Sequence, residues 1–465
     1  MTVLPDTKNK NEPVEMKEGH PRTTSNKADR HYSRSLVSSW QQIHYDPGAN
    51  DNDDFGKPSC LSGDGKTLAV AAISSDATAT DAGIVHVYKR NGSGGFTQTG
   101  PNIPGINAQD FFGWSLSLSD TGNVLAVGAP GEDRGTVRLY ADKGSYYDVF
   151  SVALVPNTAS DPIPPFVPDR FGHSISLSGD GTTVAVGAPD RPVTFIPGTG
   201  FIHGGYVQVY NKVNPAAGTT ELPPILVEPP TPTAGFGYSV SLSDDGGYLG
   251  VATLDTTVFP TFREVKIYHR TALGYEKFPD PNSGCTIANG ESVTFAGQSN
   301  VFAVRVPGVV QVYQIVGGVC STIHIGAVVP IGTLATTLDS RNEILFSLSD
   351  DGKVLAIADR PNFGGKVFVY ELVNAPANVG IGMEYQQKCQ SPINIQNSQA
   401  LSLSDNGNLV AFGTGFQPGT GSADNGFAYV YECKTETPQP ITPPTPTNPP
   451  STPPPTIVSV FLCRP

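Results

Sequence analysis

The sequence predicts an all-β chain that folds as a seven-bladed β-propeller, a ring of four-stranded antiparallel sheets. The first observation is a recurring unit: an alternating Ser-Leu-Ser-Leu stretch, a tight Asp/Gly turn, and a short run of small and β-branched residues. The second is that each unit continues into a strand ending in tyrosine and then into a fourth segment. The third is the number of copies, seven, because propellers typically have four to eight four-stranded blades.

The unit is clearest between residues 112 and 140. Residues 115–118 alternate with a period of two, which is typical of a strand. The Asp-Thr-Gly-Asn sequence at residues 120–123 predicts a tight turn. Residues 124–129 form an apolar run too short for a helix, and residues 136–140 form a third strand. Together these segments predict an antiparallel meander.

Two landmarks give the same number of copies. The fifth copy is the most divergent, because Gly-Gln-Ser-Asn at residues 297–300 replaces its Asp/Gly turn. The central apolar residue of the first strand recurs as Leu61, Leu118, Leu177, Leu242, Phe295, Leu348 and Leu403. The tyrosine that closes the third strand recurs as Tyr88, Tyr140, Tyr210, Tyr268, Tyr313, Tyr370 and Tyr431.

The two ends of the repeat array predict how the ring closes. The last copy has no fourth strand after Tyr431, and the first copy is preceded by an orphan strand at residues 39–43. We expect this N-terminal strand, with Trp40 near Tyr431, to complete the seventh blade and to leave no free sheet edge. A linear stack of sheets is the competing arrangement, and ring closure argues against it.

The flanking segments differ from the repeats in composition. Residues 1–38 are polar with mixed charge and predict a disordered tail, and residues 39–433 form the propeller. Residues 434–456 are rich in Pro and Thr and predict a stiff polyproline II linker. Residues 457–465 are a short apolar tail, too short to fold alone or to span a membrane, which either frays or docks on a partner.

Composition excludes some classes of partner. The chain has 29 Lys and Arg against 42 Asp and Glu, a formal net charge of −13. This balance disfavours nucleic acid, whose binding requires clustered basic residues. We expect no transmembrane segment, because there is no apolar run of the necessary length, and the N-terminal residues lack the apolar stretch of a signal peptide.

Two short motifs carry a resemblance to a known family. Phe-Gly opens the first strand at Phe55, Phe112, Phe171 and Phe236, and Gly-Ala-Pro ends the second strand at residues 128–130 and 187–189. These motifs resemble FG-GAP repeats, which build the seven-bladed headpiece propeller of integrin α subunits and many surface or secreted proteins. The resemblance implies an extracellular or cell-surface location and a role in cell adhesion. Fold alone does not determine function.

The candidate binding surface is the face that carries the loops between second and third strands and the connections between blades. These loops vary greatly in length, from residues 306–308 in the fifth copy to residues 190–204 in the third, and such variation above a rigid scaffold is typical of binding surfaces. Turn capping and solubility are the alternative explanation of their charged residues. The candidate ligand-binding residues are Glu132, Asp133, Arg134, Asp190, Arg191, His203, Asp255, Asp359, Arg360 and Asp424.

No cofactor is expected. Some FG-GAP repeats carry a calcium loop, and calcium requires several oxygen ligands wrapped around the ion, whereas the turns here supply one or two acids. The densest acidic cluster is Asp51, Asp53 and Asp54, a weak metal candidate that is otherwise a solvated loop.

No catalytic residue is predicted. Gly172-His173-Ser174 loosely resembles a nucleophile elbow, but it lacks the second glycine and opens a strand. The same position recurs as Trp114 and Tyr238, which indicates a structural role. A glycosidase-like pair of carboxylates stays open, since its members are often far apart in sequence.

The six cysteines follow no repeat register. Strand direction predicts that Cys285 and Cys320 lie on opposite faces, too far apart for a disulfide. Cys433 and Cys463 are the candidate pair, and Cys60 is expected to be a small buried residue. Asn91 begins one glycosylation sequon, which matters only if the chain is secreted.

Three functions are compatible with these sequence features. The first is a non-enzymatic recognition or adhesion module that binds a protein or glycan through the variable-loop face. The second is a carbohydrate-active hydrolase or lyase with acidic residues at the mouth of the channel. The third is a structural spacer.

Overall fold

The computed structural model divides the chain into two units, Met1–Leu36 and Val37–Pro465, and every residue that it describes belongs to the second. The predicted N-terminal tail, the Pro/Thr-rich linker and the C-terminal apolar tail therefore lie outside the described residues. The described residues are 38–50, 53–151, 153–156, 168–196, 200–211, 213, 224–229, 233–255, 261–278, 285–297, 300–307, 309–317, 319–322, 345–359, 365–374, 383–389, 392–395, 398–414 and 426–435.

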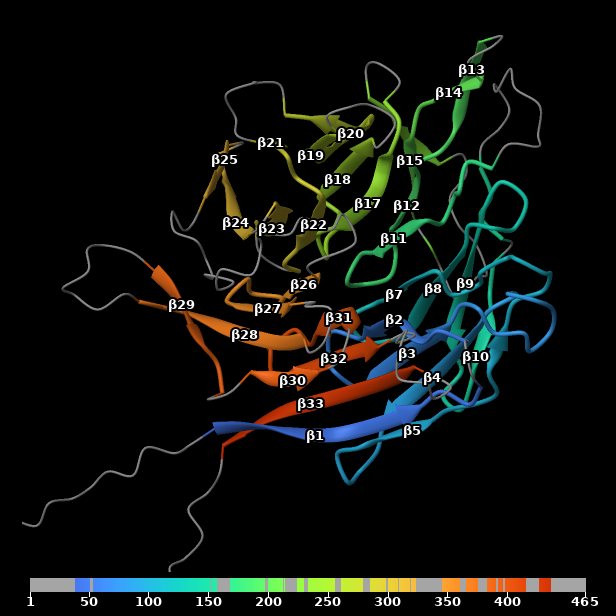
Figure 1. The fold of residues 1–465 in the computed structure, drawn as a ribbon. Helices are drawn as coiled ribbons and strands as arrows, with labels where there is room; N and C mark the ends of the chain where they lie inside the picture. The colour runs from blue at the N-terminus through green and yellow to red at the C-terminus, as the bar shows by residue number, and fades with distance from the viewer. Residues whose placement is uncertain are drawn as a thin grey trace, which may run out of the picture. The chain divides into compact units, whose positions relative to one another are not determined.

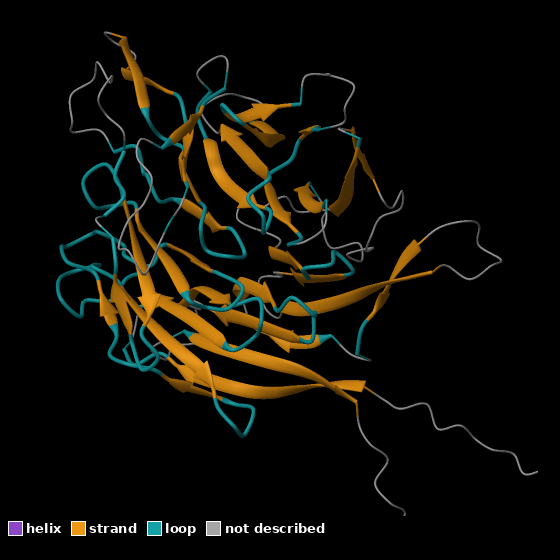
Figure 2. Cartoon of the chain, turned by 180° about the vertical axis from the view of Figure 1, so that it is seen from behind, coloured by secondary structure: helices purple, strands orange, loops and turns teal. Residues whose placement is uncertain are grey.

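The second unit is a seven-bladed β-propeller, and no helix occurs among the residues that the structure describes (Figures 1 and 2). The predicted fold class is therefore confirmed. Each blade is an antiparallel sheet. In the first six blades the four main strands follow in chain order from the inside outward, whereas the outermost strand of blade seven is β1 from the N-terminus.

The strands of the first four blades are as follows. Blade one holds β2 (Phe55–Leu61), β3 (Thr67–Ala72), β4 (Ile84–Arg90) and β5 (Phe96–Gln98), with β6 (Ile103–Pro104) also paired to β4. Blade two holds β7 (Ser115–Leu118), β8 (Val124–Ala129), β9 (Thr136–Asp142) and β10 (Tyr147–Val149). Blade three holds β11 (Ser174–Leu177), β12 (Val184–Ala188), β15 (Tyr206–Tyr210) and β16 (Ile225–Val227), with a separate hairpin of β13 (Pro192–Ile196) and β14 (Gly200–His203). Blade four holds β17 (Phe236–Leu242), β18 (Tyr248–Asp255), β19 (Phe262–Thr271) and β20 (Gly274–Lys277), with β21 (Thr286–Ala288) also on β19.

The last three blades follow the same plan. Blade five holds β22 (Ser292–Phe295), β23 (Val301–Val306), β24 (Val309–Val316) and β25 (Val319–Thr322). Blade six holds β26 (Leu345–Leu348), β27 (Val354–Asp359), β28 (Gly365–Asn374) and β29 (Met383–Gln387), with β30 (Ile393–Ile395) also on β28. Blade seven holds β31 (Ser398–Leu403), β32 (Leu409–Thr414), β33 (Phe427–Thr435) and β1 (Ser38–Pro47).

The N-terminal strand closes the ring as predicted. β1 pairs antiparallel with β33, so that Trp40 faces Cys433 and Gln42 faces Tyr431 (Figure 1). The strand is longer than predicted and continues to Pro47 after a bulge between Gln42 and His44. β33 is therefore paired on both sides, with β32 on the inside and β1 on the outside. Both ends of the propeller contribute to this one blade, so the edge of β33 is covered.

The core lies between the blades. Seven clusters of buried side chains occupy the seven junctions of neighbouring blades. The second strand of each blade packs on both neighbours, and in β3, β8, β12 and β32 every residue is buried. This double burial explains why the second strands consist of small and β-branched residues.

Hydrogen bonds between inner strands explain the Ser-Leu-Ser-Leu motif. The Ser117 hydroxyl accepts the backbone N–H of Leu177 in the next blade at 2.9 Å. Blade one has Cys60 at the equivalent position, and its sulfur accepts the backbone N–H of Leu118. The same bond joins Ser176 to Leu242, Ser241 to Phe295, Ser347 to Leu403, and Ser402 to Leu61.

The Phe-Gly motif has a structural cause. Phe112 is fully buried, and Gly113 has a φ of 96°, which side-chain-bearing residues rarely adopt. A Cβ atom at Gly113 would lie 2.7 Å from the Cβ of Ala71 in blade one. Glycine therefore allows the inner strand to begin close to the neighbouring blade.

The predicted disulfide arrangement is wrong. Cys285 bonds to Cys320, with 5.1 Å between their Cα atoms, and Cys433 bonds to Cys389 instead of Cys463, which lies outside the described residues. The prediction placed Cys285 at the end of a fourth strand. In the structure its carbonyl accepts the N–H of Ile267 halfway along β19, because β20 and β21 are two parts of one interrupted outer strand.

Candidate functional site

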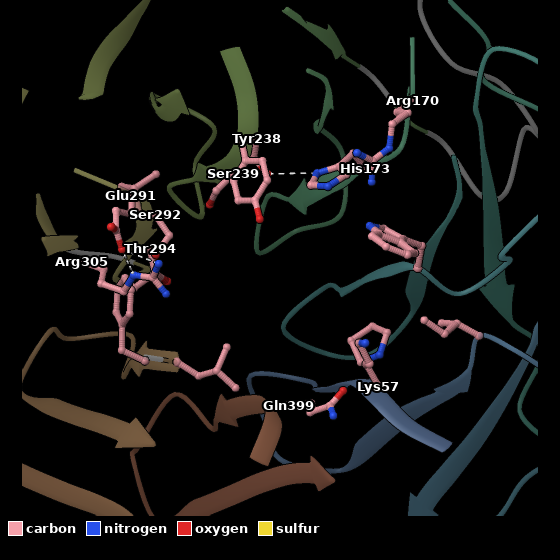
Figure 3. A pocket seen from close by; sticks show the side chains of 16 residues that line it. Lys57, Arg170, His173, Tyr238, Ser239, Glu291, Ser292, Thr294, Arg305 and Gln399 are labelled. Carbon is pink, nitrogen blue, oxygen red and sulfur yellow. Dashed lines mark hydrogen bonds and ion pairs between the residues drawn. The ribbon is translucent and has the colours of Figure 1, made fainter. Parts of the chain in front are cut away.

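A cavity lies where the inner strands of the blades begin, on the predicted variable-loop face. It has a volume of about 930 Å³, within the range of small-molecule sites. Figure 3 shows side chains from blades around the ring facing this space, which we call the axial pocket. One repeat position, four residues before the central apolar residue of the first strand, supplies a lining side chain in six of the seven copies, and its equivalent in blade six, Ile344, lies outside the described residues. These mouth residues are Lys57, Trp114, His173, Tyr238, Glu291 and Gln399.

One wall of the axial pocket is aromatic. The ring centroids of Trp114 and His173 are 5.8 Å apart, and those of His173 and Tyr238 are 4.9 Å apart. The Arg170 guanidinium lies over the Trp114 ring at 5.5 Å, a distance typical of a cation–π contact. The three aromatic side chains come from successive blades, so the wall follows the curvature of the ring.

His173 is neutral in this wall. Burial, followed by the neighbouring positive charge of Arg170, lowers the pKa of His173 to about 3. Its Nδ1 lies 3.2 Å from the Tyr238 carbonyl oxygen, which only accepts hydrogen bonds, so we assign the proton to Nδ1. The imidazole therefore contributes a flat polar surface without a charge.

Charged side chains also line the pocket. Glu291 accepts a hydrogen bond of 2.6 Å from Nε of Arg305 (Figure 3). Glu291 is also paired with Arg263, which does not line the pocket. Arg170 is paired with Asp190 at 3.2 Å. The Lys57 side chain makes no hydrogen bond or ion pair with any described residue. Among the described residues that line the pocket, three charged side chains are cations and one, Glu291, is a carboxylate.

Several predicted loop residues form ion pairs in blades two and three. Glu132 pairs with Arg138 at 2.6 Å, and Arg134 pairs with the buried Asp169 at 2.6 Å. Asp133 lies beside them with a φ of 50°. These pairs order the loops above the strands, and the residues do not line the axial pocket.

The remaining predicted loop residues are dispersed. His203 contacts the carbonyl oxygen of Asp190 through Nδ1 at 2.7 Å, and Arg191 lies 5.2 Å over the Tyr206 ring. Asp255 is buried at the end of β18, and Asp359 is the last residue of β27. Arg360 and Asp424 lie outside the described residues. Asp190 is paired with Arg170, which lines the axial pocket, but none of the predicted residues that the structure describes lines the pocket itself. A ligand-binding role for this set stays a prediction.

The structure also locates the metal and glycosylation candidates. Asp53 accepts a hydrogen bond from Asn50 at 3.0 Å, Asp54 has a φ of 55°, and Asp51 lies outside the described residues. In the described part of the chain, no three His, Cys, Asp or Glu residues are grouped to hold a metal ion. Asn91 lies in the turn after β4, where its side-chain oxygen accepts the Ser93 N–H at 3.1 Å. The described residues contain no helix long and apolar enough to cross a membrane.

A second cluster lies at the opposite ends of the inner strands. The axial aspartates, Asp120, Asp244, Asp350 and Asp405, occupy the first position of the Asp/Gly turn, which other blades fill with glycine. A Cβ atom at Gly63 would lie 2.2 Å from a carboxylate oxygen of Asp405, so glycine leaves room for the neighbouring acid.

Burial and mutual repulsion perturb the axial aspartates. Burial is the larger cause and neighbouring carboxylates the second, and together they raise the pKa of Asp120 to about 6 and that of Asp405 to about 7. The pKa of Asp244 is raised in the same way and by a hydrogen bond with Asp350. The cluster is therefore partly protonated near neutral pH.

The mouth residues were not predicted from the sequence. The sequence indicates a structural role for Trp114, His173 and Tyr238, because the same position recurs in these three copies. In a closed ring, however, a position at the start of every inner strand converges on the axis. The useful signal was the variety of side chains at this position, which ranges from lysine and glutamate to tryptophan.

The match to a known family agrees with this architecture. Residues 105–150, which contain blade two, match the FG-GAP repeat family. No curated protein matches the sequence. The match identifies the repeat and does not single out integrin α subunits.

Solved structures similar to this chain include the following. One is a chain of a mitotic checkpoint complex, with 12% identity and a TM-score of 0.47, covering 91% of this chain and 98% of that chain. Another is a periplasmic gluconolactonase of Pseudomonas aeruginosa, with 18% identity and a TM-score of 0.40, covering 70% of this chain and 84% of that chain. The FG-GAP repeat matched in blade two and the ring of seven four-stranded blades together support the interpretation of the chain as an FG-GAP β-propeller.

Proposed function

We propose that this propeller is a non-enzymatic recognition module that binds a protein or glycan at the axial pocket and the loops around it. The observation that carries the proposal is the convergence of mouth residues from six blades on a cavity of about 930 Å³. Their side chains combine aromatic rings, a free ammonium and a side-chain amide, the mixture from which binding sites are commonly built.

The charges of the pocket favour recognition over hydrolysis. Glycoside hydrolysis normally requires two carboxyl groups on opposite sides of the scissile bond. Among the described residues that line the pocket, Glu291 is the one carboxylate, and two guanidinium groups hold it. His173 donates its proton to a backbone carbonyl, so it is poorly placed to act as an acid.

We also propose an extracellular or cell-surface location. The two disulfides, Cys285–Cys320 and Cys389–Cys433, support it. Disulfides persist mainly in oxidising compartments such as the cell exterior.

The test is binding of the full chain to an array of immobilised saccharides and peptides of defined structure. We expect the double variant Trp114→Ala/Tyr238→Ala to lose at least tenfold in retention on the spots that the native chain binds. Tyr146→Ala is the matched control, because this tyrosine is 43% exposed in the turn before β10, away from the pocket. Full retention by the double variant would refute the pocket as the binding site. Release of shortened saccharides would refute the non-enzymatic assignment.

A further inference from the structure

We propose that the ligand of the axial pocket is an acidic saccharide, a chain of sugar units that carry carboxylate groups. This inference rests on the proposed function and specifies the chemistry of its ligand. It follows from the charge of the described lining residues, from Lys57, which has no partner among the described residues, and from the combination of aromatic and uncharged polar side chains.

The charge of the pocket is opposite to that of the protein. The chain carries a net charge of −13, yet the charged side chains among the described lining residues are Lys57, Arg170 and Arg305 against the carboxylate of Glu291. A concave site bounded by protein focuses such a local field, so it attracts anions even on an acidic molecule. An excess of positive charge at this position therefore favours an anionic ligand.

The two cations nearest the aromatic wall differ in what they can still bind. Lys57 has no partner among the described residues, so its ammonium is available for a carboxylate. Arg170 uses Nη1 for Asp190, and its stacking over Trp114 fixes the plane of the guanidinium. Its remaining N–H groups are therefore held in a defined direction beside the aromatic wall.

The anion is more consistent with a carboxylate than with a phosphate. A phosphate monoester carries nearly two charges at neutral pH, and Glu291 lies in the same lining. Arg263 and Arg305 are occupied by Glu291, so they are not available to neutralise a second charge. A carboxylate carries one charge, which Lys57 can match.

The uncharged side chains match a sugar ring. Aromatic faces carry partial negative charge and attract the C–H groups on the apolar face of a sugar. Trp114 and Tyr238 are both partly exposed in the wall that contains His173. Ser239, Thr294 and Gln399 supply hydroxyl and amide groups that can hydrogen-bond sugar hydroxyls. An acidic peptide would use the cations but would not need a row of ring faces, so it is the less favoured ligand.

The test uses two probes with the same sugar backbone, tetragalacturonate and its full methyl ester, in which a methyl group neutralises each carboxylate. Isothermal titration of the native full-length chain is expected to show binding of the acid at least tenfold tighter than of the ester. Lys57→Gln is expected to remove most of this difference, and Lys57→Arg to restore it. Lys66→Gln is the matched control, since Lys66 follows the same inner strand in blade one but lies at its opposite end and is 73% exposed. Trp114→Ala is expected to weaken both probes equally.

The outcomes separate this inference from the proposed function. Equal affinity for the acid and the ester, or an unchanged preference in Lys57→Gln, would overturn the inference. If neither probe binds while an acidic tetrapeptide binds and depends on Lys57, the ligand is a peptide, and the inference fails while the proposed function stands. If the array ligands are indifferent to Trp114→Ala/Tyr238→Ala, the proposed function itself fails.

Discussion

The axial aspartates make the stability of the propeller depend on pH in a direction opposite to that of most paired carboxylates. The pKa of Asp405 is raised to about 7, first by burial and then by Asp120, Asp350 and Asp64. In the unfolded chain the same group has an ordinary pKa near 3.8. Its contribution to stability is therefore complete below about pH 4 and is lost as the pH rises through about 7. Asp405→Asn removes this loss, because the amide has nearly the same shape and never ionises.

The magnitude follows from the pKa. Each pKa unit corresponds to about 1.4 kcal/mol, so the interval from 3.8 to about 7 sets a ceiling of about 4 kcal/mol above neutral pH. Asp405 is only half-buried, and solvent screens its repulsion, so we expect Asp405→Asn to stabilise the protein by about 1 to 2 kcal/mol at pH 8. At pH 4 the two proteins should differ by less than about 0.5 kcal/mol, because the native carboxyl group is then protonated.

Urea unfolding of the full chain at pH 4, 6 and 8 measures these differences. Asp148→Asn is the matched control, since it makes the same chemical change at an exposed residue in β10. We expect the double variant Asp120→Asn/Asp405→Asn to gain less than the sum of the single variants, because each change relieves the repulsion that the other would relieve. An equal effect of Asp405→Asn at pH 4 and pH 8 would refute the assignment of repulsion to this group. So would destabilisation at pH 8.

Three further predictions concern the ring itself. Cys285→Ala/Cys320→Ala should cost about 2 to 4 kcal/mol of unfolding free energy in urea, given the separation of 35 residues that the bond closes; a cost near zero would mean that the bond does not form. Ser117→Ala should cost about 1 to 2 kcal/mol, because it leaves the backbone N–H of Leu177 without its acceptor; Ser93→Ala, at an exposed turn, should be neutral in the same urea series. Trp40→Ala should speed hydrogen exchange of the β1 amides while leaving those of β8 unchanged, since Trp40 packs against the junction of blades six and seven; unchanged exchange in β1 would contradict its role in closure.

The repeat architecture could be predicted because its determinants are local and periodic. Each blade carries its own alternating strand, turn and buried second strand, and seven copies reinforce the same interpretation. The closing strand could also be predicted, since Trp40 and Tyr431 lie at the two ends of an array that lacks one strand. Its full length could not, because the bulge after Gln42 depends on the partner strand β33.

The features that escaped prediction depend on contacts between distant segments. The position of Cys285 could not be predicted because the outer strand is interrupted between β20 and β21. This interruption places Cys285 beside Ile267 in the middle of β19, and no local sequence pattern indicates it. Arg134 pairs with Asp169, and Arg170 pairs with Asp190. Each pair joins two different loops, so the sequence alone suggested exposed charges at Arg134 and Asp190, whereas the structure pairs both. The mouth residues were visible in the repeat alignment, but their convergence becomes evident only when the ring is closed.

The pairing of β1 with β33 has a mechanical consequence. Ser38 and Thr435 are direct partners at one end of this ladder, so the chain enters and leaves the propeller at adjacent points. A pulling force applied to both flanking segments would act on the Ser38–Thr435 pair first and peel the two strands apart one pair at a time. Opening by this route requires less force than sliding all the pairs at once. Tension between the two ends would therefore separate β1 from β33 before it disturbed the other six blades.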